Sequence, residues 1–149
     1  MKWDFRRRFG FLVSDVARLY GQQFDRLARE KIGLSQAQCR LLGVLAAHGD
    51  GRMSQAELAQ RLGLTAMAVA GMCDRMASAG WLRREPHPTD RRINELHLEP
   101  SAAKALASAM DIGDALSARA LAGLSAAERT QLLGLLGKAR DALLEEKAS

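Results

Sequence analysis

Cysteine is scarce in this chain of 149 residues, which contains only Cys39 and Cys73. Two cysteines on their own cannot form a disulfide framework or a four-ligand metal site. The first 13 residues carry charges of both signs and lack a small-residue cleavage site, so we expect no secretory signal. Together these features predict a protein of the reducing cytoplasm that has no structural metal.

Aromatic residues, long hydrophobic runs and catalytic motifs are also missing. Aromatics make up 5% of the chain, and abundant alanine, leucine and glycine favour helices packed closely on small side chains. The uncharged stretch 62–73 is far too short to span a membrane, so no membrane contact is expected. There is no Ser/His/Asp or Cys/His arrangement, paired-carboxylate motif or phosphate-binding glycine loop. We therefore expect neither an enzyme nor a bound cofactor.

Positive charge is in excess, with a net charge of +5 and a pI of about 9.8. Most of the basic residues are arginines, which favour bidentate contacts to phosphate and guanine. This composition suggests an anionic partner, although the same charge would also serve plain solubility.

Helical periodicity begins near the N-terminus. Apolar residues recur there at steps of four and three, at Phe5, Phe9, Leu12, Val16 and Leu19. The spacing predicts one long amphipathic helix that runs from this stripe to about residue 31 and ends at Gly33.

Further helix starts are marked by a capping-box pattern, Ser-x-x-Glu/Gln, at residues 35–38, 54–57 and 125–128. The first box opens a helix that ends in the turn 48–51, and the second opens a short helix over 57–62 that Gly63 breaks. Thr65 then caps a helix over 66–79. Pro100 suits the first position of a helix of about twenty residues that Gly123 ends, and the third box opens the last helix.

The period changes to two between residues 81 and 98. Residues 81–85 and 93–98 are predicted to be strands, joined by the stiff, charged hairpin tip 86–92. The fold is therefore expected to be mostly α with a small β-wing, and residues 35–99 of the single unit 1–149 form a winged helix-turn-helix. In such a block the second short helix enters a major groove and the hairpin contacts the neighbouring minor groove.

Four segments point to a known family: residues 58–65 (LAQRLGLT), 74–76 (DRM), 80–82 (GWL) and 90–92 (DRR). They resemble the MarR/SlyA family of bacterial transcriptional regulators, and the order of the flanking helices matches as well, so the resemblance covers nearly the whole chain. The wing motif Asp-x-Arg at this distance from a helix-turn-helix is specific. The resemblance implies a homodimer held by residues 1–34 and 100–149. It also implies a pseudo-palindromic double-stranded DNA operator and a small aromatic ligand that weakens DNA binding.

The predicted recognition helix departs from this family at Gly71, where arginine or a polar residue is common. Few hydrogen bonds to base edges are available from the outward positions Thr65, Ala66, Met67, Ala70 and Gly71. A glycine there also costs roughly 1 kcal/mol of helix propensity. We expect the wing and the shape of the DNA to supply more of the specificity. A second departure, Glu99-Pro100 in place of threonine, is expected to change only the start of the following helix.

The wing carries the strongest candidates for DNA contact. Arg91 and Arg92 on a hairpin tip suit a narrow minor groove, where the negative potential is enhanced. Asp90 would repel phosphate, so its predicted role is to hold one of these arginines by a bidentate pair.

Weaker candidates lie on the helices. Backbone N–H groups at helix starts can bind phosphate, which singles out Ser54, Gln55, Thr65 and Ala66, although plain capping is the alternative. Arg75 is predicted either to contact phosphate or to pair with a neighbour on its helix. The family resemblance further implies a ligand cleft lined by Tyr20, Phe24 and His48.

The leading hypothesis is a dimeric, sequence-specific DNA-binding regulator, a repressor that a small aromatic ligand releases. One alternative is a winged-helix module that binds a protein, rather than DNA, through Met67, Ala70 and Gly71. Another is an oxidant sensor that uses Cys39 or Cys73, although Cys73 falls on the apolar face of its helix and is expected to be a buried small hydrophobe.

Overall fold

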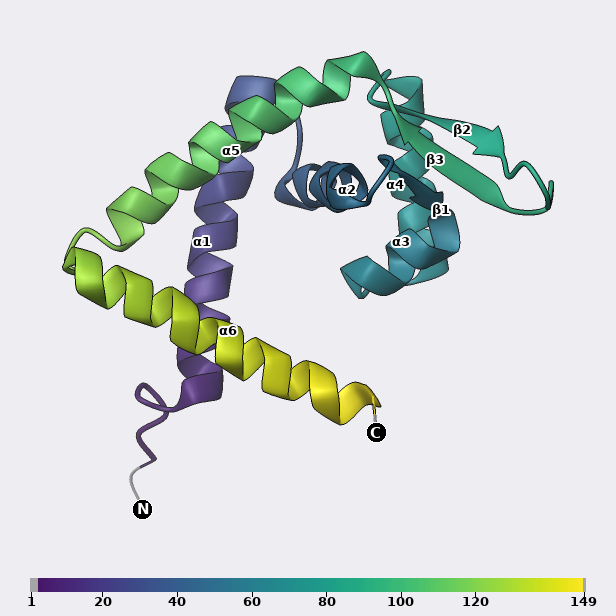
Figure 1. Cartoon of the computed structure of the whole chain (residues 1–149). Helices are drawn as coiled ribbons and strands as arrows, with labels where there is room; N and C mark the ends of the chain where they lie inside the picture. Colours follow the sequence, from purple (N-terminus) through teal and green to yellow (C-terminus); the bar gives the residue numbers. More distant parts are fainter. Residues whose placement is uncertain (1–2, 149) are drawn as a thin grey trace. The chain divides into compact units, whose positions relative to one another are not determined.

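The computed structural model describes residues 3–148, so the ends of the expected 1–149 unit, Met1, Lys2 and Ser149, lie outside it. The described residues form six helices and three strands (Figure 1). In chain order these are α1 (Phe9–Ile32), α2 (Gln36–Ala47), β1 (Arg52–Ser54), α3 (Gln55–Leu62), α4 (Ala66–Ser78), β2 (Leu82–Pro86), β3 (Asn94–Leu98), α5 (Pro100–Ala120) and α6 (Ala126–Ala148). The expected class, mostly α with a small β-wing, is confirmed. The chain divides into two compact units, one up to Gly113 and one from Asp114 onward.

The capping boxes set the helix starts largely as predicted. At α2 the amide of Gln38 donates to Ser35 Oγ (3.1 Å), and the amide of Ser35 donates to Gln38 Oε1 (2.9 Å). The box at α6 closes in both directions in the same way. The box at α3 is half-formed: Ser54 Oγ accepts from the amide of Glu57 (3.1 Å), but the Glu57 carboxylate binds Arg61 instead.

Two helix starts were predicted wrongly. The long N-terminal helix begins at Phe9, not at Phe5, because Arg8 has an extended backbone (φ −83°, ψ 138°) and no side chain caps the helix. The ring of Phe5 instead stacks on that of Phe11, with a centroid separation of 4.8 Å. The third helix begins at Gln55, directly after its cap, and not two residues later.

The sheet contains a strand that the periodicity did not predict. Strand β1 has three residues, too few to show alternation, and it exists through pairing with β3, where Met53 lies opposite Leu96. The sheet order is β1-β3-β2 and both pairings are antiparallel. The β2–β3 register places Leu82 opposite Leu98 and Arg84 opposite Leu96. Since paired residues lie on the same face of a sheet, Arg84 shares the face of the buried Leu82 and Leu96.

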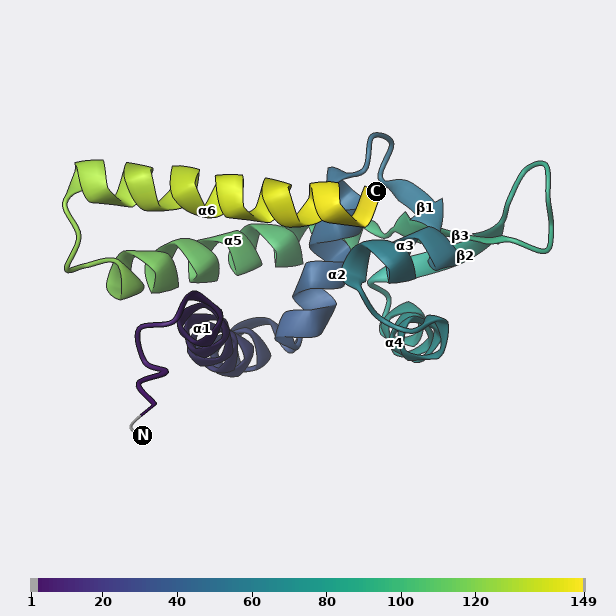
Figure 2. The same cartoon turned by 90° about the horizontal axis from the view of Figure 1, so that it is seen from below.

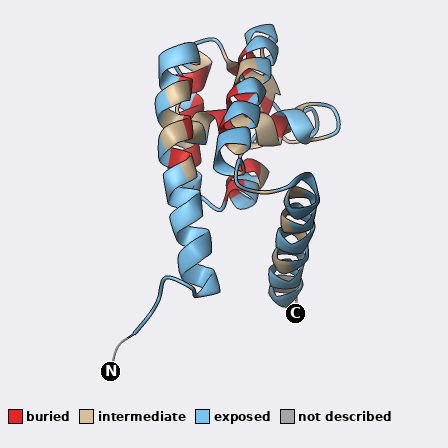
Figure 3. Cartoon of the chain, turned by 90° about the vertical axis from the view of Figure 1, so that its left-hand side faces the viewer, coloured by how far each residue is buried: buried red, intermediate tan, exposed pale blue. Residues whose placement is uncertain are grey.

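The core of the first unit lies between the sheet and helices α2 to α4. The fully buried side chains there are Leu41, Leu42, Leu45, Leu58, Val69, Cys73, Met76 and Leu96. Figure 3 shows that burial stops along α1: its C-terminal half carries buried residues, and its N-terminal half is exposed on all sides. The exposed apolar residues of that half are Phe9, Phe11, Leu12, Val13, Val16 and Leu19.

The second unit consists of the end of α5, a turn and α6. Arg129 at the start of α6 donates its Nε to the carbonyl of Leu121 (3.2 Å), which ties the helix to the turn. Several leucines of α6 are exposed in the single chain, namely Leu133, Leu135, Leu136, Leu143 and Leu144. No helix within residues 3–148 is both long and apolar enough to cross a membrane.

Candidate nucleic-acid interface

Helices α3 and α4 form the predicted helix-turn-helix. The turn is made by Gly63, which adopts a left-handed backbone (φ 66°) that favours glycine, and Thr65 caps α4 by accepting from the amide of Ala68 (3.1 Å). Helix α4 buries one face through Val69, Met72, Cys73 and Met76. At 100° per residue, the opposite face carries Met67, Gly71 and Asp74. Figure 2 shows α4 beside the projecting β2–β3 hairpin.

The helix starts keep backbone amides available. Ser54 Oγ caps one amide of α3, and Thr65 Oγ1 caps one amide of α4. Because the first four N–H groups of a helix have no partner inside it, other amides of each first turn, including those of Gln55 and Ala66, remain for an anion. Capping, the alternative reading, is thus observed, and phosphate contact at these residues stays a prediction.

Arg75 lies exposed on α4 and forms no hydrogen bond or ion pair with any described residue. Its guanidinium folds back along the helix toward Gly71, where Nη1 lies 3.6 Å from the position that a β-carbon added to the glycine would occupy. Pairing of Arg75 with a helix neighbour, one of its two predicted roles, is therefore absent from the structure. Its charge remains available for phosphate.

The wing has the internal bond that the sequence predicted. Arg92 donates Nε to Asp90 Oδ1 (3.0 Å) and Nη2 to Asp90 Oδ2 (3.1 Å), a bidentate pair, and its amide also donates to Oδ1 (3.1 Å). The Arg92 guanidinium holds the pKa of the Asp90 carboxyl below its usual value. The Arg92 side chain remains 90% exposed, so this pair orients the arginine without burying it.

Arg84 is the residue that sequence reasoning missed. From β2 it donates Nε to Gln55 Oε1 of α3 (3.2 Å), Nη2 to the carbonyl oxygen of Ala70 in α4 (3.1 Å), and Nη1 to Asp74 Oδ1. Arg84 therefore joins the wing to both helices of the helix-turn-helix. The signal was available: strand alternation from the buried Leu82 places Arg84, and not its neighbour Arg83, on the helix-facing side.

Arginines 83 and 84 thus have different roles. Arg83 lies on the outer face of the sheet, where its side chain is 46% exposed and pairs with Glu85 (2.8 Å) and Glu99 (3.4 Å). Acidic partners also neutralise Arg52, Arg61 and Arg92. Of the seven arginines between residues 51 and 99, only Arg75 and Arg91 have no acidic partner among the described residues. The two unpaired charges lie on the recognition helix and on the wing, the elements expected to contact DNA.

The residues of the implied ligand cleft are only partly brought together. Tyr20 and Phe24 both lie on α1, and their rings stack on each other with centroids 6.2 Å apart. Both side chains face Gly113 of α5. His48 caps the far end of α2, about 18 Å along the helix axis from its first residue at a rise of 1.5 Å per residue.

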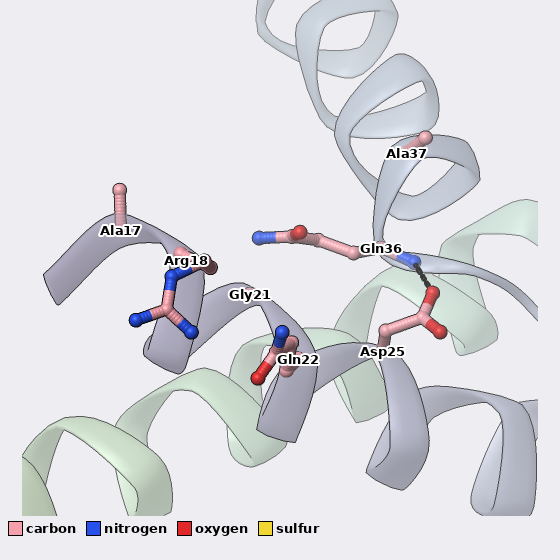
Figure 4. A pocket seen from close by; sticks show the side chains of 7 residues that line it. All are labelled: Ala17, Arg18, Gly21, Gln22, Asp25, Gln36 and Ala37. Carbon is pink, nitrogen blue, oxygen red and sulfur yellow. Dashed lines mark hydrogen bonds between the residues drawn. The ribbon is translucent and has the colours of Figure 1, made fainter. Parts of the chain in front are cut away.

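A depression of about 330 Å³ lies instead between α1 and the start of α2 (Figure 4). It is lined by Ala17, Arg18, Gly21, Gln22, Asp25, Gln36 and Ala37. Asp25 Oδ1 accepts from the amide of Gln36 (2.9 Å), and this bond, followed by the one from Arg29, lowers the pKa of Asp25. The lining combines polar side chains with alanine and glycine, and it contains none of the three residues expected to contact a ligand.

Both cysteines lie in apolar surroundings. Cys73 is fully buried on the inner face of α4 and Cys39 is buried in α2, which confirms Cys73 as a buried small hydrophobe. Burial raises the pKa of both thiols. Since the thiolate is the reactive form, these features disfavour the oxidant-sensor alternative.

Comparison with known proteins places this architecture among regulators. The model of the MarR family matches residues 32–93. The chain is 26% identical over 131 residues to YdgJ of Bacillus subtilis, an uncharacterized HTH-type transcriptional regulator, covering 88% of this chain and 76% of YdgJ.

Two solved structures are similar over most of both chains. The S. aureus MepR–DNA complex has a TM-score of 0.76 and 22% identity, covering 90% of this chain and 97% of MepR. BpsR of Bordetella bronchiseptica, whose DNA binding is regulated by 6-hydroxynicotinic acid, has a TM-score of 0.78 and 21% identity, covering 95% of this chain and 99% of BpsR. At these identities the two structures establish a shared fold.

Proposed function

The chain belongs to the MarR family of transcriptional regulators, and we propose that it is a homodimeric repressor that binds a pseudo-palindromic DNA operator. The observation that carries this proposal is the guanidinium of Arg84, which joins the wing strand to α3 and α4. A winged block held in this way presents a recognition helix and a hairpin in one fixed geometry, as binding to adjacent grooves requires.

Within each block, the start of α4 enters the major groove and the wing contacts the neighbouring minor groove. Arg92, oriented by Asp90, and the unpaired Arg91 supply positive charge at the wing tip. First-turn amides of α3 and α4 bind the phosphates between the two grooves, and Arg75 adds a charge-assisted contact to the backbone.

The exposed apolar residues support the dimer. The N-terminal half of α1 and the leucines of α6 each leave several large apolar side chains uncovered in the single chain, and exposed apolar surface of this kind marks an interface. We infer that residues 1–34 and 100–149 hold the dimer, with a total buried area above ~2,000 Å² as in obligate dimers. A stable monomer in sedimentation at micromolar concentration would contradict this.

We further propose that a ligand releases the protein from its operator. A small aromatic molecule that favours a different spacing of the two winged blocks would weaken operator binding, because half-sites lie about one helical turn, or ~34 Å, apart. Tyr20 and Phe24, stacked on α1, are the residues inferred to contact it. We propose that the protein acts in the cytoplasm, where its operator is found.

Selection of bound sequences from random double-stranded DNA tests the DNA-binding proposal. We expect a two-fold symmetric consensus. Alanine at Arg91 or Arg92 should weaken binding to it by about tenfold or more per subunit, and the salt dependence should fall by about one unit for each phosphate that the variant no longer binds. If no sequence is enriched over input, the proposal fails and a protein partner for the winged block becomes the better reading.

A further inference from the structure

The groove-facing surface of α4 is poor in hydrogen-bonding groups. Ala66, Ala70 and Gly71 offer no side-chain donor or acceptor at all. Thr65 Oγ1 is already used by the helix cap, and the Asp74 carboxylate is already bound by Arg84. Toward the C-terminal end of α4, Arg75 and Ser78 keep unengaged polar groups among the described residues of this face.

Met67 dominates that surface. Its side chain is 85% exposed, the highest value among the large apolar residues of the described chain, and it lies in the first turn of α4. The buried face of the helix, centred on Val69 and Met76, points away from it. With so little of its surface covered, packing within the described residues does not explain a methionine at this position.

The chemistry of the major groove restricts what such a surface can recognise. Three of the four bases present only hydrogen-bonding groups there, whereas thymine adds a 5-methyl group. An apolar side chain gains free energy against that methyl group and gains none against a bare amino or carbonyl group. A recognition helix whose residues 66–71 offer no side-chain hydrogen-bond donor, and which has an exposed methionine in its first turn, is thus matched to thymine.

We propose that Met67 is a specificity-determining residue that recognises the 5-methyl group of a thymine in each operator half-site. This inference rests on the proposed function and deepens it, since it names the base chemistry that α4 recognises. The polar remainder of the half-site is then recognised by the wing, while Arg75 contacts the DNA backbone. A protein partner fits this surface less well, because one methionine amid small residues, on a helix that also carries the unpaired Arg75, provides little apolar area.

Replacement of thymine by deoxyuracil isolates the methyl group, since base pairing and every hydrogen-bonding group are unchanged. We would take the selected consensus duplex, replace the thymines one symmetric pair at a time, and measure affinity by fluorescence anisotropy. At one position deoxyuracil should weaken binding about fourfold for each methyl group removed, from ~0.8 kcal/mol per buried carbon group.

Variants of Met67 assign the effect to this residue. Met67→Ala should bind the thymine and deoxyuracil duplexes with equal affinity, because the methyl group has lost its partner. Met67→Leu, which keeps an apolar side chain, should restore part of the preference.

The outcomes separate this inference from the proposed function. If the consensus duplex binds tightly and no thymine pair is sensitive to deoxyuracil, the DNA-binding proposal stands and the role of Met67 is refuted. If deoxyuracil weakens binding equally in the parent and in Met67→Ala, another residue recognises the methyl group and the inference is again refuted. Failure to enrich any sequence would refute both.

Discussion

The Arg84→Ala variant tests whether one side chain fixes the wing against the helix-turn-helix. The guanidinium bonds that it removes join β2 to Gln55, Ala70 and Asp74. The bond to the Gln55 amide contributes about 1 kcal/mol. The ion pair to Asp74, whose side chain is 68% exposed, contributes no more than ~1 kcal/mol.

Two further contributions complete the estimate. The Arg84 side chain is only 26% exposed, so part of its methylene stem packs on the core, which adds about 1 kcal/mol. Loss of the bond to the Ala70 carbonyl adds no desolvation cost, because that carbonyl also accepts a backbone hydrogen bond within α4. We therefore expect the free energy of unfolding to fall by about 2–3 kcal/mol.

Urea denaturation followed by circular dichroism measures this change, and Arg83→Ala is the matched control. Arg83 is the adjacent residue of the same strand, has the same chemistry, and lies on the outer face of the sheet in exposed ion pairs. Its loss should affect stability much less. Arg84→Ala should also weaken operator binding under conditions where it is fully folded, because the wing and α4 are no longer held together.

Equal losses of stability in the Arg83 and Arg84 variants would refute the reasoning, since the two residues differ mainly in the face of the strand they occupy. Unchanged operator affinity in a folded Arg84→Ala protein would show that the wing does not need this connection. A lysine at position 84 should recover only part of the binding, because it cannot present three donors in a fixed plane.

Three further predictions concern single positions. Asp90→Ala should weaken operator binding in anisotropy titrations even though it removes a negative charge, because Arg92 loses the carboxylate that orients it; tighter binding would mean that net charge alone matters. Gly71→Ala should raise the free energy of unfolding in urea by about 0.5–1 kcal/mol, since the added carbon meets only an arginine nitrogen at an ordinary 3.6 Å; a destabilised variant would contradict this. The pKa of Asp25 is lowered in the folded chain, so its stabilisation is present above the ordinary value of 3.8 and is lost as the pH falls through the lowered value. Asp25→Asn should flatten the acid side of the stability–pH curve, and an unchanged curve would argue against the bond to the start of α2.

Local chemistry explains why so much of the fold was predictable. Capping at Ser35, Ser125 and Thr65 depends on residues three positions apart, and the structure contains those bonds. The pairing of Asp90 with one of the two wing arginines was likewise predicted, and the structure shows the partner to be Arg92, two residues away. Where the local signal was weak, as at the uncapped start of α1, the boundary was wrong by four residues.

The sequence by itself determined the order of the helices, the wing, its orienting carboxylate and the burial of Cys73, because helical period, strand alternation and short-range hydrogen bonds are properties of neighbouring residues. Only the tertiary structure decided that β1 exists, because three residues become a strand only when β3 supplies the partner bonds. It also decided which arginines are free and which are engaged. Arg83 and Arg84 are adjacent in the chain, yet the register of the sheet turns one toward outer-face carboxylates and the other toward α3 and α4. Such a difference arises from groups brought together across the fold, and neighbouring residues cannot specify it.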